Sequence, residues 1–164
     1  MNKPIAIIVI IVVVLLGLMF FGQRNAATGP SAAEATVSSA LTASEKLYDF
    51  GTISMVRGKV NHLFKITNPT GKDITVEDLT TSCMCTSAYF MDGATKQGPF
   101  GMPGMGYVPK ANLLIKAGET KDIEVEYDPN AHGPAGVGSI DRFIYLASKS
   151  AGTLELEIKA VVTP

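Results

Sequence analysis

The chain has no tryptophan and few of the residues that most often carry catalysis. Its 164 residues include only two histidines and two cysteines. General acid–base catalysis draws most often on histidine, and neither histidine here has a nucleophile elbow or other supporting motif around it. No glycine-rich phosphate loop precedes a predicted helix. These absences favour a binding or structural module and predict that the protein is not an enzyme.

An excess of basic charge is also missing. The 14 Lys and Arg residues face 15 Asp and Glu residues, which gives a formal net charge of −1. Proteins that hold nucleic acid through its phosphates need a basic surface. We therefore expect no nucleic-acid partner. The length suits one domain of ordinary size.

One long apolar run lies at the N-terminus. Residues 5–21 read IAIIVIIVVVLLGLMFF, and Lys3 precedes them. A spanning helix needs about 17 to 25 residues, whereas the core of a signal peptide has about 7 to 15. We predict a cytoplasmic stub at 1–4, a transmembrane anchor at 5–22 and an extracytoplasmic remainder, at the cell surface or in the periplasm. A cleaved signal peptide is the alternative.

A stretch rich in Ala, Ser and Thr follows the apolar run. Residues 23–44 contain too few large apolar side chains to offset the entropy of ordering, so we predict a flexible linker. Such a linker reaches about 25 Å. A helical continuation of the anchor is the alternative. The folded domain is then expected at 45–164.

Alternation of apolar and polar residues dominates this last part. It is clearest at 59–68 and 153–162, and shorter apolar runs lie between turn sequences such as Asn-Pro-Thr-Gly at 68–71 and Asp-Pro-Asn at 128–130. A period of two is typical of strands with one buried face. The pattern predicts an all-β antiparallel sandwich with no helix after the linker.

The two cysteines are separated by a single residue, in Cys83-Met84-Cys85. Side chains at i and i+2 of an extended backbone point to the same side, so the two sulfurs are expected to form a pair. Three kinds of chemistry suit such a pair in an exported protein. These are a disulfide, a soft-metal site and thiol redox catalysis.

The metal interpretation draws on other soft ligands in the chain. Thiolates and thioethers favour Cu(I), and two methionines lie in a loop too rich in Gly and Pro to form a core strand or helix. A histidine in a second loop offers a nitrogen. The predicted ligands are Cys83, Cys85, Met84, Met102, Met105 and His132. The alternative for each methionine is packing in the core.

The other two interpretations have weaker support. Residues i and i+2 of a fully extended strand lie near the upper limit of Cα separation for a disulfide, so a bridge needs a local kink. Redox enzymes lower a thiol pKa with a helix N-terminus or a neighbouring positive charge. The neighbours here, Thr80-Thr81-Ser82 and Thr86-Ser87, are neutral hydroxyls.

Several motifs resemble DUF1573, a bacterial family of Ig-like domains related to the Hydin-type and major-sperm-protein-type modules. They are Tyr48-Asp49-Phe50-Gly51-Thr52-Ile53, Cys83-x-Cys85-Thr86, Gly118-Glu119 and Tyr127-Asp128, within residues 46–162. The resemblance implies an Ig-like β-sandwich of about seven to eight strands, exported and often anchored, with no established activity. Two features depart from the family pattern. Met84 replaces a glycine, and residues 92–110 form an inserted loop.

Together these observations predict a membrane-tethered, extracytoplasmic Ig-like binding module without enzymatic activity, which holds Cu(I) through the Cys-Met-Cys segment. Two alternatives remain. One is a protein-interaction or assembly module that uses loop 92–110 or an edge strand and holds no metal. The other is a thiol redox protein.

Overall fold

A computed structural model describes residues 39–164, which fold into β-strands joined by turns and two short 3-10 helices. The expected cytoplasmic stub, the anchor at 5–22 and most of the linker lie outside the described residues. Within residues 39–164, no helix is long and apolar enough to cross a membrane.

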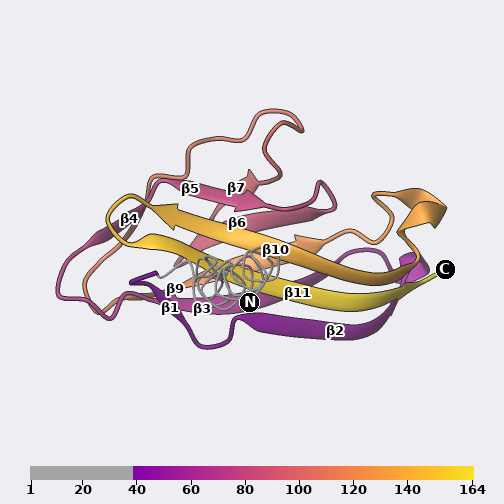
Figure 1. The fold of residues 1–164 in the computed structure, drawn as a ribbon, viewed down its shortest axis with the longest axis horizontal. Helices are drawn as coiled ribbons and strands as arrows, with labels where there is room; N and C mark the ends of the chain where they lie inside the picture. Colours follow the sequence, from indigo (N-terminus) through magenta and orange to yellow (C-terminus); the bar gives the residue numbers. More distant parts are fainter. Residues whose placement is uncertain (1–38) are drawn as a thin grey trace, which may run out of the picture. The chain divides into compact units, whose positions relative to one another are not determined.

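Two sheets form the body of the domain (Figure 1). The first has the strand order β1 (Thr42–Ala43), β3 (Val60–Thr67), β9 (Thr120–Tyr127), β6 (Thr86–Asp92) and β7 (Thr95–Phe100). The second has the order β2 (Leu47–Ser54), β11 (Gly152–Thr163), β10 (Gly138–Ser148) and β5 (Asp78–Thr81). A small third sheet pairs β4 (Ile74–Val76) with β8 (Leu113–Ile115), and the 3-10 helices are η1 (Met55–Arg57) and η2 (Gly133–Gly136).

The core lies between the two sheets and follows the alternation in the sequence. In β11 every second residue is buried, namely Leu154, Leu156, Ile158, Ala160 and Val162. In β3 the inward residues Phe64 and Ile66 are fully buried. The predictions of strands at 59–68 and 153–162, and of an all-β sandwich, are therefore confirmed.

One strand pairing differs from the antiparallel arrangement that we expected. β2 runs parallel to β11, with Tyr48 opposite Ile158 and Ile53 opposite Val162. A hairpin forces antiparallel pairing, but no hairpin joins these strands, because the chain leaves β2 through η1 and continues as β3 in the other sheet. The connections of β2 therefore allow it to run either parallel or antiparallel to β11.

The folded part begins before residue 45. Leu41 is 2% exposed, and β1 pairs with β3 through Thr42–Thr67 and Ala43–Ile66. Residues 39–44, expected as the end of the linker, thus belong to the sandwich. Apart from Leu41, their side chains are small and show no alternation of apolar and polar residues that would predict a strand.

The segment 92–110 is partly a strand. After Asp92 the chain turns back as β7, which pairs with β6 and buries Phe100 in the core. Gly98 suits this position because its φ is +136° and an added Cβ would lie 2.9 Å from the carbonyl oxygen of Ala88. Only the residues after Phe100 form an extended loop, which leads to β8.

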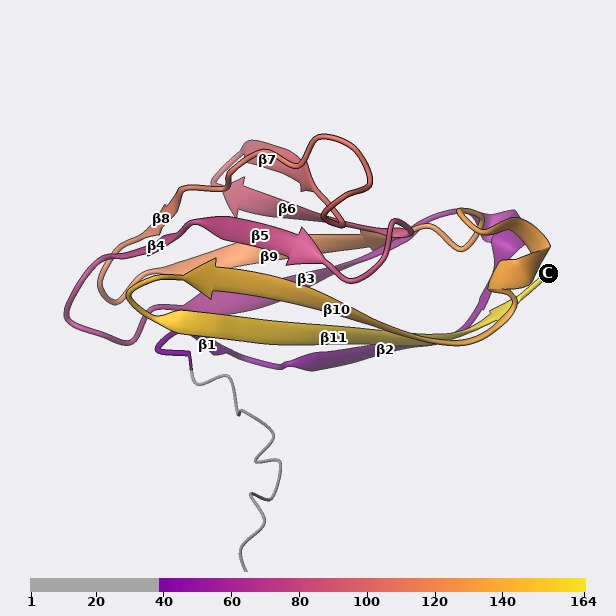
Figure 2. The same cartoon turned by 45° about the horizontal axis from the view of Figure 1, so that its top comes forward.

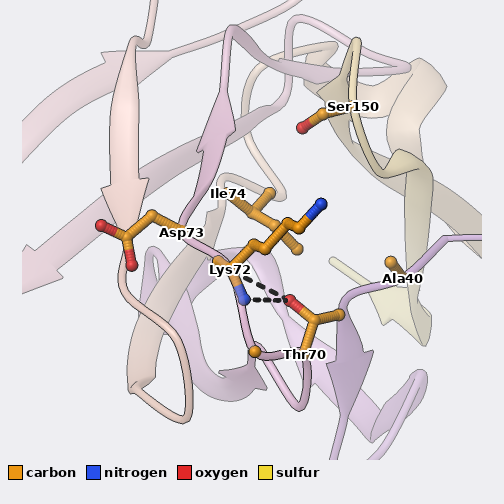
Figure 3. A pocket seen from close by; sticks show the side chains of 7 residues that line it. Ala40, Thr70, Lys72, Asp73, Ile74 and Ser150 are labelled. Atoms are coloured by element: carbon orange, nitrogen blue, oxygen red, sulfur yellow. Dashed lines mark hydrogen bonds between the residues drawn. The ribbon is translucent and has the colours of Figure 1, made fainter.

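The turn after β3 has a buried polar centre. The side-chain amide of Asn68 donates to the carbonyls of Lys72 and Ile115 at 2.8 and 2.9 Å, and its oxygen accepts from the backbone and hydroxyl of Thr70. Beside this turn lies a cavity of about 420 Å³, lined in part by Thr70, Lys72 and Ser150 (Figure 3). Within the described residues, the one cluster of potential metal ligands lies elsewhere, at the Cys83–Cys85 turn.

Candidate functional site

Residues 81–86 carry the chain from one sheet to the other. Thr81 ends β5 in the second sheet, and Thr86 begins β6 in the first. The buried hydroxyl of Thr81 lies 3.0 Å from the carbonyl oxygens of both Cys83 and Thr86 and shares its single proton between them. The backbone N–H of Thr86 donates to the carbonyl of Cys83 at 3.1 Å, which closes a tight turn around the two cysteines. We call residues 82–85 the cysteine turn.

The cysteine turn is fastened to both sheets. The backbone N–H of Ser82 donates to the carbonyl of Phe143 in β10, and the N–H of Phe143 donates back to the hydroxyl of Ser82, both at 2.9 Å. On the other side, the N–H of Asp128, just after β9, donates to the carbonyl of Cys85 at 2.8 Å. Figure 2 shows this turn between the end of β5 and the start of β6. These hydrogen bonds therefore hold the backbone that carries the two cysteines.

Cys83 and Cys85 are joined by a disulfide, with Cα atoms 5.3 Å apart. The pair was expected at the end of an extended strand, but it lies in a turn. That turn supplies the local kink a bridge needs, since Cα atoms of extended residues i and i+2 are about 6.6 Å apart. Cys83 is half-buried, and Cys85 is 2% exposed.

His132 lies next to the disulfide, although it is distant in sequence. Its Nε2 is 3.2 Å from the Sγ of Cys83. The Sγ atoms of both cysteines and a ring nitrogen of His132 all lie within 4.8 Å of one another. The loop that presents His132 begins with an Asx turn, in which the carboxylate of Asp128 accepts from the N–H of Asn130 at 2.8 Å. The structure thus brings together three of the six predicted ligands.

Arg142 is a fourth member of this cluster that the sequence analysis missed. Its Nε donates to the Sγ of Cys85 at 3.3 Å, and its Nη1 donates to the carbonyl of Asp141 at 2.8 Å. Burial raises the pKa of Tyr127, and the positive charge of Arg142 opposes this shift. A sequence signal existed, because Arg142 lies between Ile140 and Ile144 on the same, inward face of β10.

Among the described residues, the guanidinium of Arg142 lies within ion-pair distance of no carboxylate. A half-buried positive charge is costly without a compensating negative group. The atom that Nε contacts is the sulfur of Cys85, which becomes negative when the disulfide is reduced and the thiol ionises. Arg142 is therefore placed to stabilise a thiolate.

The three predicted methionines gather in a neighbouring cavity. Met84, Met102 and Met105 line a space of about 260 Å³ together with Tyr107 and Val108. Neither cysteine and no part of His132 lines it. Met84 and Met105 are half exposed, at 50% and 56%. The predicted ligands thus form two sets, the Cys–His cluster and the methionine cavity, which adjoin along the backbone at Met84.

Part of the chain matches the model of a known family. Residues 41–103 match the family model described as "Protein of unknown function (DUF1573)". The predicted resemblance to DUF1573 is confirmed over these residues. The matched part includes the cysteine turn but not His132 or Arg142. No curated protein matches the sequence.

Two solved structures share the fold seen here at low sequence identity. A protein of unknown function from Porphyromonas gingivalis W83 has a TM-score of 0.53 at 17% identity, over 79% of this chain and 50% of that one. A family 123 glycoside hydrolase from Clostridium perfringens has a TM-score of 0.52 at 8% identity, over 71% of this chain and 22% of that one. The chain thus spans half or less of these proteins, and the likeness establishes the fold alone.

The role of Thr81 is tested by replacing its hydroxyl with a methyl group. Thr81→Val removes the buried hydroxyl that Cys83 and Thr86 share as a donor, and the carbonyl of Cys83 keeps only the N–H of Thr86, so we expect a loss of about 1–3 kcal/mol in the free energy of unfolding. Urea denaturation of the oxidised protein measures it. Thr80→Val, one residue earlier on the opposite face of β5, is the matched control and should change stability by less than about 0.5 kcal/mol. Equal losses in the two variants would contradict the assigned role.

Proposed function

We propose that this domain is a non-enzymatic metal-binding module in which reduced Cys83 and Cys85, with His132, hold one Cu(I) ion. One observation carries the proposal. The two sulfur atoms and the imidazole nitrogen come from two separate loops and lie within 4.8 Å of one another. Small adjustments of these side chains would place all three around a single ion.

The chemistry of the three ligands favours Cu(I). Thiolates are soft ligands that select Cu(I), and imidazole also suits copper. A structural zinc site needs four protein ligands, whereas the cluster in residues 39–164 supplies three. Cu(I) is satisfied by fewer ligands than zinc.

The charge of the site supports the same ion. Two thiolates and one Cu(I) carry a net negative charge, and a half-buried negative charge needs a positive partner. Arg142, whose Nε lies 3.3 Å from the sulfur of Cys85, supplies it. The disulfide must first be reduced to two thiols by an external dithiol, which is itself oxidised to a disulfide, and Cu(I) binding then releases the two thiol protons.

The methionine cavity is a second set of soft ligands through which copper would reach or leave the Cys–His cluster. Met84 belongs to the cysteine turn and also lines the cavity with Met102 and Met105. Thioethers bind Cu(I) more weakly than thiolates do. We assign these three methionines to the capture or transfer of copper, next to a tighter Cys–His site.

Copper binding is measured by titrating the reduced, full-length protein in detergent without oxygen, against a colorimetric Cu(I) chelator. We expect one tightly bound ion per chain and none in the Cys83→Ser/Cys85→Ser variant. His132→Gln should weaken binding at least about tenfold, since even indirect support of a ligand is worth about that much. Met102→Leu/Met105→Leu should keep the tight ion.

The second histidine provides the matched control. His62 stacks on Tyr48 at 3.5 Å and lies 2.8 Å from a carboxylate oxygen of Glu45, so it takes no part in the cluster. His62→Gln should leave copper affinity unchanged. Failure of the reduced protein to compete with a weak chelator, or full binding by the double serine variant, would remove the metal proposal.

We further propose that residues 5–22 anchor this module to a membrane, with the β-domain on the extracytoplasmic side. The apolar run and the Ala/Ser/Thr-rich segment after it motivate this arrangement. When cells are fractionated, the full chain should stay in the membrane pellet after a carbonate wash. Protease added to spheroplasts should digest the β-domain. Recovery of a shortened chain in the soluble extracytoplasmic fraction would instead indicate a cleaved signal peptide.

A further inference from the structure

The Cys83–Cys85 disulfide joins a half-buried cysteine to an almost fully buried one. We propose that the oxidised domain exchanges this disulfide with the thiols of a dithiol partner, with Cys83 as the sulfur attacked and Cys85 as the leaving group. The proposal goes beyond metal binding and does not rest on it, because exchange takes place in the oxidised, metal-free protein.

Burial distinguishes the two sulfurs. Cys83 is half-buried, whereas Cys85 is 2% exposed and contributes to the hydrophobic core. A thiolate attacks one sulfur of a disulfide and displaces the other, and access decides which sulfur is attacked. Cys83 is therefore the more accessible of the two cysteines to a partner thiolate.

The surroundings of Cys85 suit a leaving group. When the bond breaks, Cys85 takes the electron pair and becomes a thiolate. The Nε–H of Arg142 already points at this sulfur from 3.3 Å, and no carboxylate in residues 39–164 competes for the guanidinium in an ion pair. A hydrogen bond from a cation strengthens as negative charge develops on its acceptor, so Arg142 favours departure of Cys85.

The bond itself contributes little to stability. Its two cysteines are separated by two positions in the sequence, so it closes a very short loop and removes little entropy from the unfolded chain. The cysteine turn is held instead by Thr81, by the Ser82–Phe143 pair and by Asp128. These hydrogen bonds do not involve sulfur, so the turn keeps its shape when the disulfide opens.

The exchange transfers two electrons from the partner to this domain. A partner thiolate attacks Sγ of Cys83, the bond from Cys83 to Cys85 breaks, and a mixed disulfide forms between the partner and Cys83. A second thiolate of the partner then attacks the partner sulfur that is bonded to Cys83, and Cys83 is released. The partner dithiol is oxidised to a disulfide, this domain is reduced to a dithiol, and the two partner protons end on Cys83 and Cys85.

The attacked sulfur is identified with reduced glutathione as the probe thiol. The oxidised full-length protein, in detergent with a copper chelator present, is incubated with glutathione, quenched with acid and mapped by mass spectrometry. We expect glutathione on Cys83 in the mixed disulfide. An adduct on Cys85, or neither adduct nor reduction at millimolar glutathione, would overturn the proposal.

The rate of reduction tests the part played by Arg142. Arg142→Gln should slow reduction by glutathione about tenfold, as expected for loss of one charge-assisted hydrogen bond to the leaving sulfur. Arg142→Lys keeps the charge and should recover part of the rate, which separates this effect from misfolding. Arg57→Gln, at an exposed arginine in η1, is the matched control and should react like the parent protein. Equal rates in all four proteins would overturn the assignment.

The exchange proposal and the copper proposal are tested independently of each other. Copper affinity is measured on the reduced protein, and exchange is measured on the oxidised protein with copper removed. A protein that binds no Cu(I) but forms the Cys83 adduct retains the exchange activity, and the reverse result retains only the metal site.

Discussion

The hydroxyl of Thr81 governs the geometry of the candidate site. It shares one proton between the carbonyls of Cys83 and Thr86 where the chain passes from one sheet to the other, and Thr81 is almost completely buried. A buried carbonyl without a donor is costly, so this hydroxyl favours one tight path between β5 and β6 over looser ones. Both sulfurs take their positions from that path.

The rest of the cluster follows from strand register. β5 pairs antiparallel with β10, with Ile144 opposite Thr81. Two residues earlier in β10, Arg142 therefore lies beyond the end of β5, beside the cysteine turn, and alternation turns its side chain inward. On the other side, Asp128 donates its N–H to Cys85 and also starts the loop that presents His132. Ordinary sandwich geometry thus gathers two sulfurs, an imidazole and a guanidinium.

Much of the fold was predictable from the sequence, because long strands with one buried face leave a period of two. β3 and β11 were found in this way. β1 and β7 were not, since one has only two residues and the other, Thr-Lys-Gln-Gly-Pro-Phe, buries Phe100 alone. The parallel direction of β2 depends on partners distant in sequence, which no local pattern encodes.

The site was predictable only in part. The spacing of Cys83 and Cys85 identified the sulfur pair, and their separation in an extended strand argued against a bond that the turn in fact permits. His132 was named as a candidate, but its contact with Cys83 depends on two loops meeting in space. Arg142 stood among apolar residues of a strand and was passed over. An inward-facing charge in an otherwise apolar alternation is the signal that could have found it.

The disulfide and the dithiol give the cluster two chemical states with different proposed roles. The oxidised state offers the less buried sulfur at Cys83 and a cation beside Cys85, whereas the reduced state offers two soft ligands next to His132. Arg142 serves both states, because negative charge develops at the same sulfur in each.

X-ray absorption at the copper edge, on reduced protein loaded with one equivalent of Cu(I), is the most direct test of this account. The spectrum should show two sulfur ligands and one nitrogen of imidazole type, and the nitrogen should disappear in His132→Gln. A first shell of sulfur alone that changes in Met102→Leu/Met105→Leu would contradict it, because the methionine cavity and not the Cys–His cluster would then hold the ion.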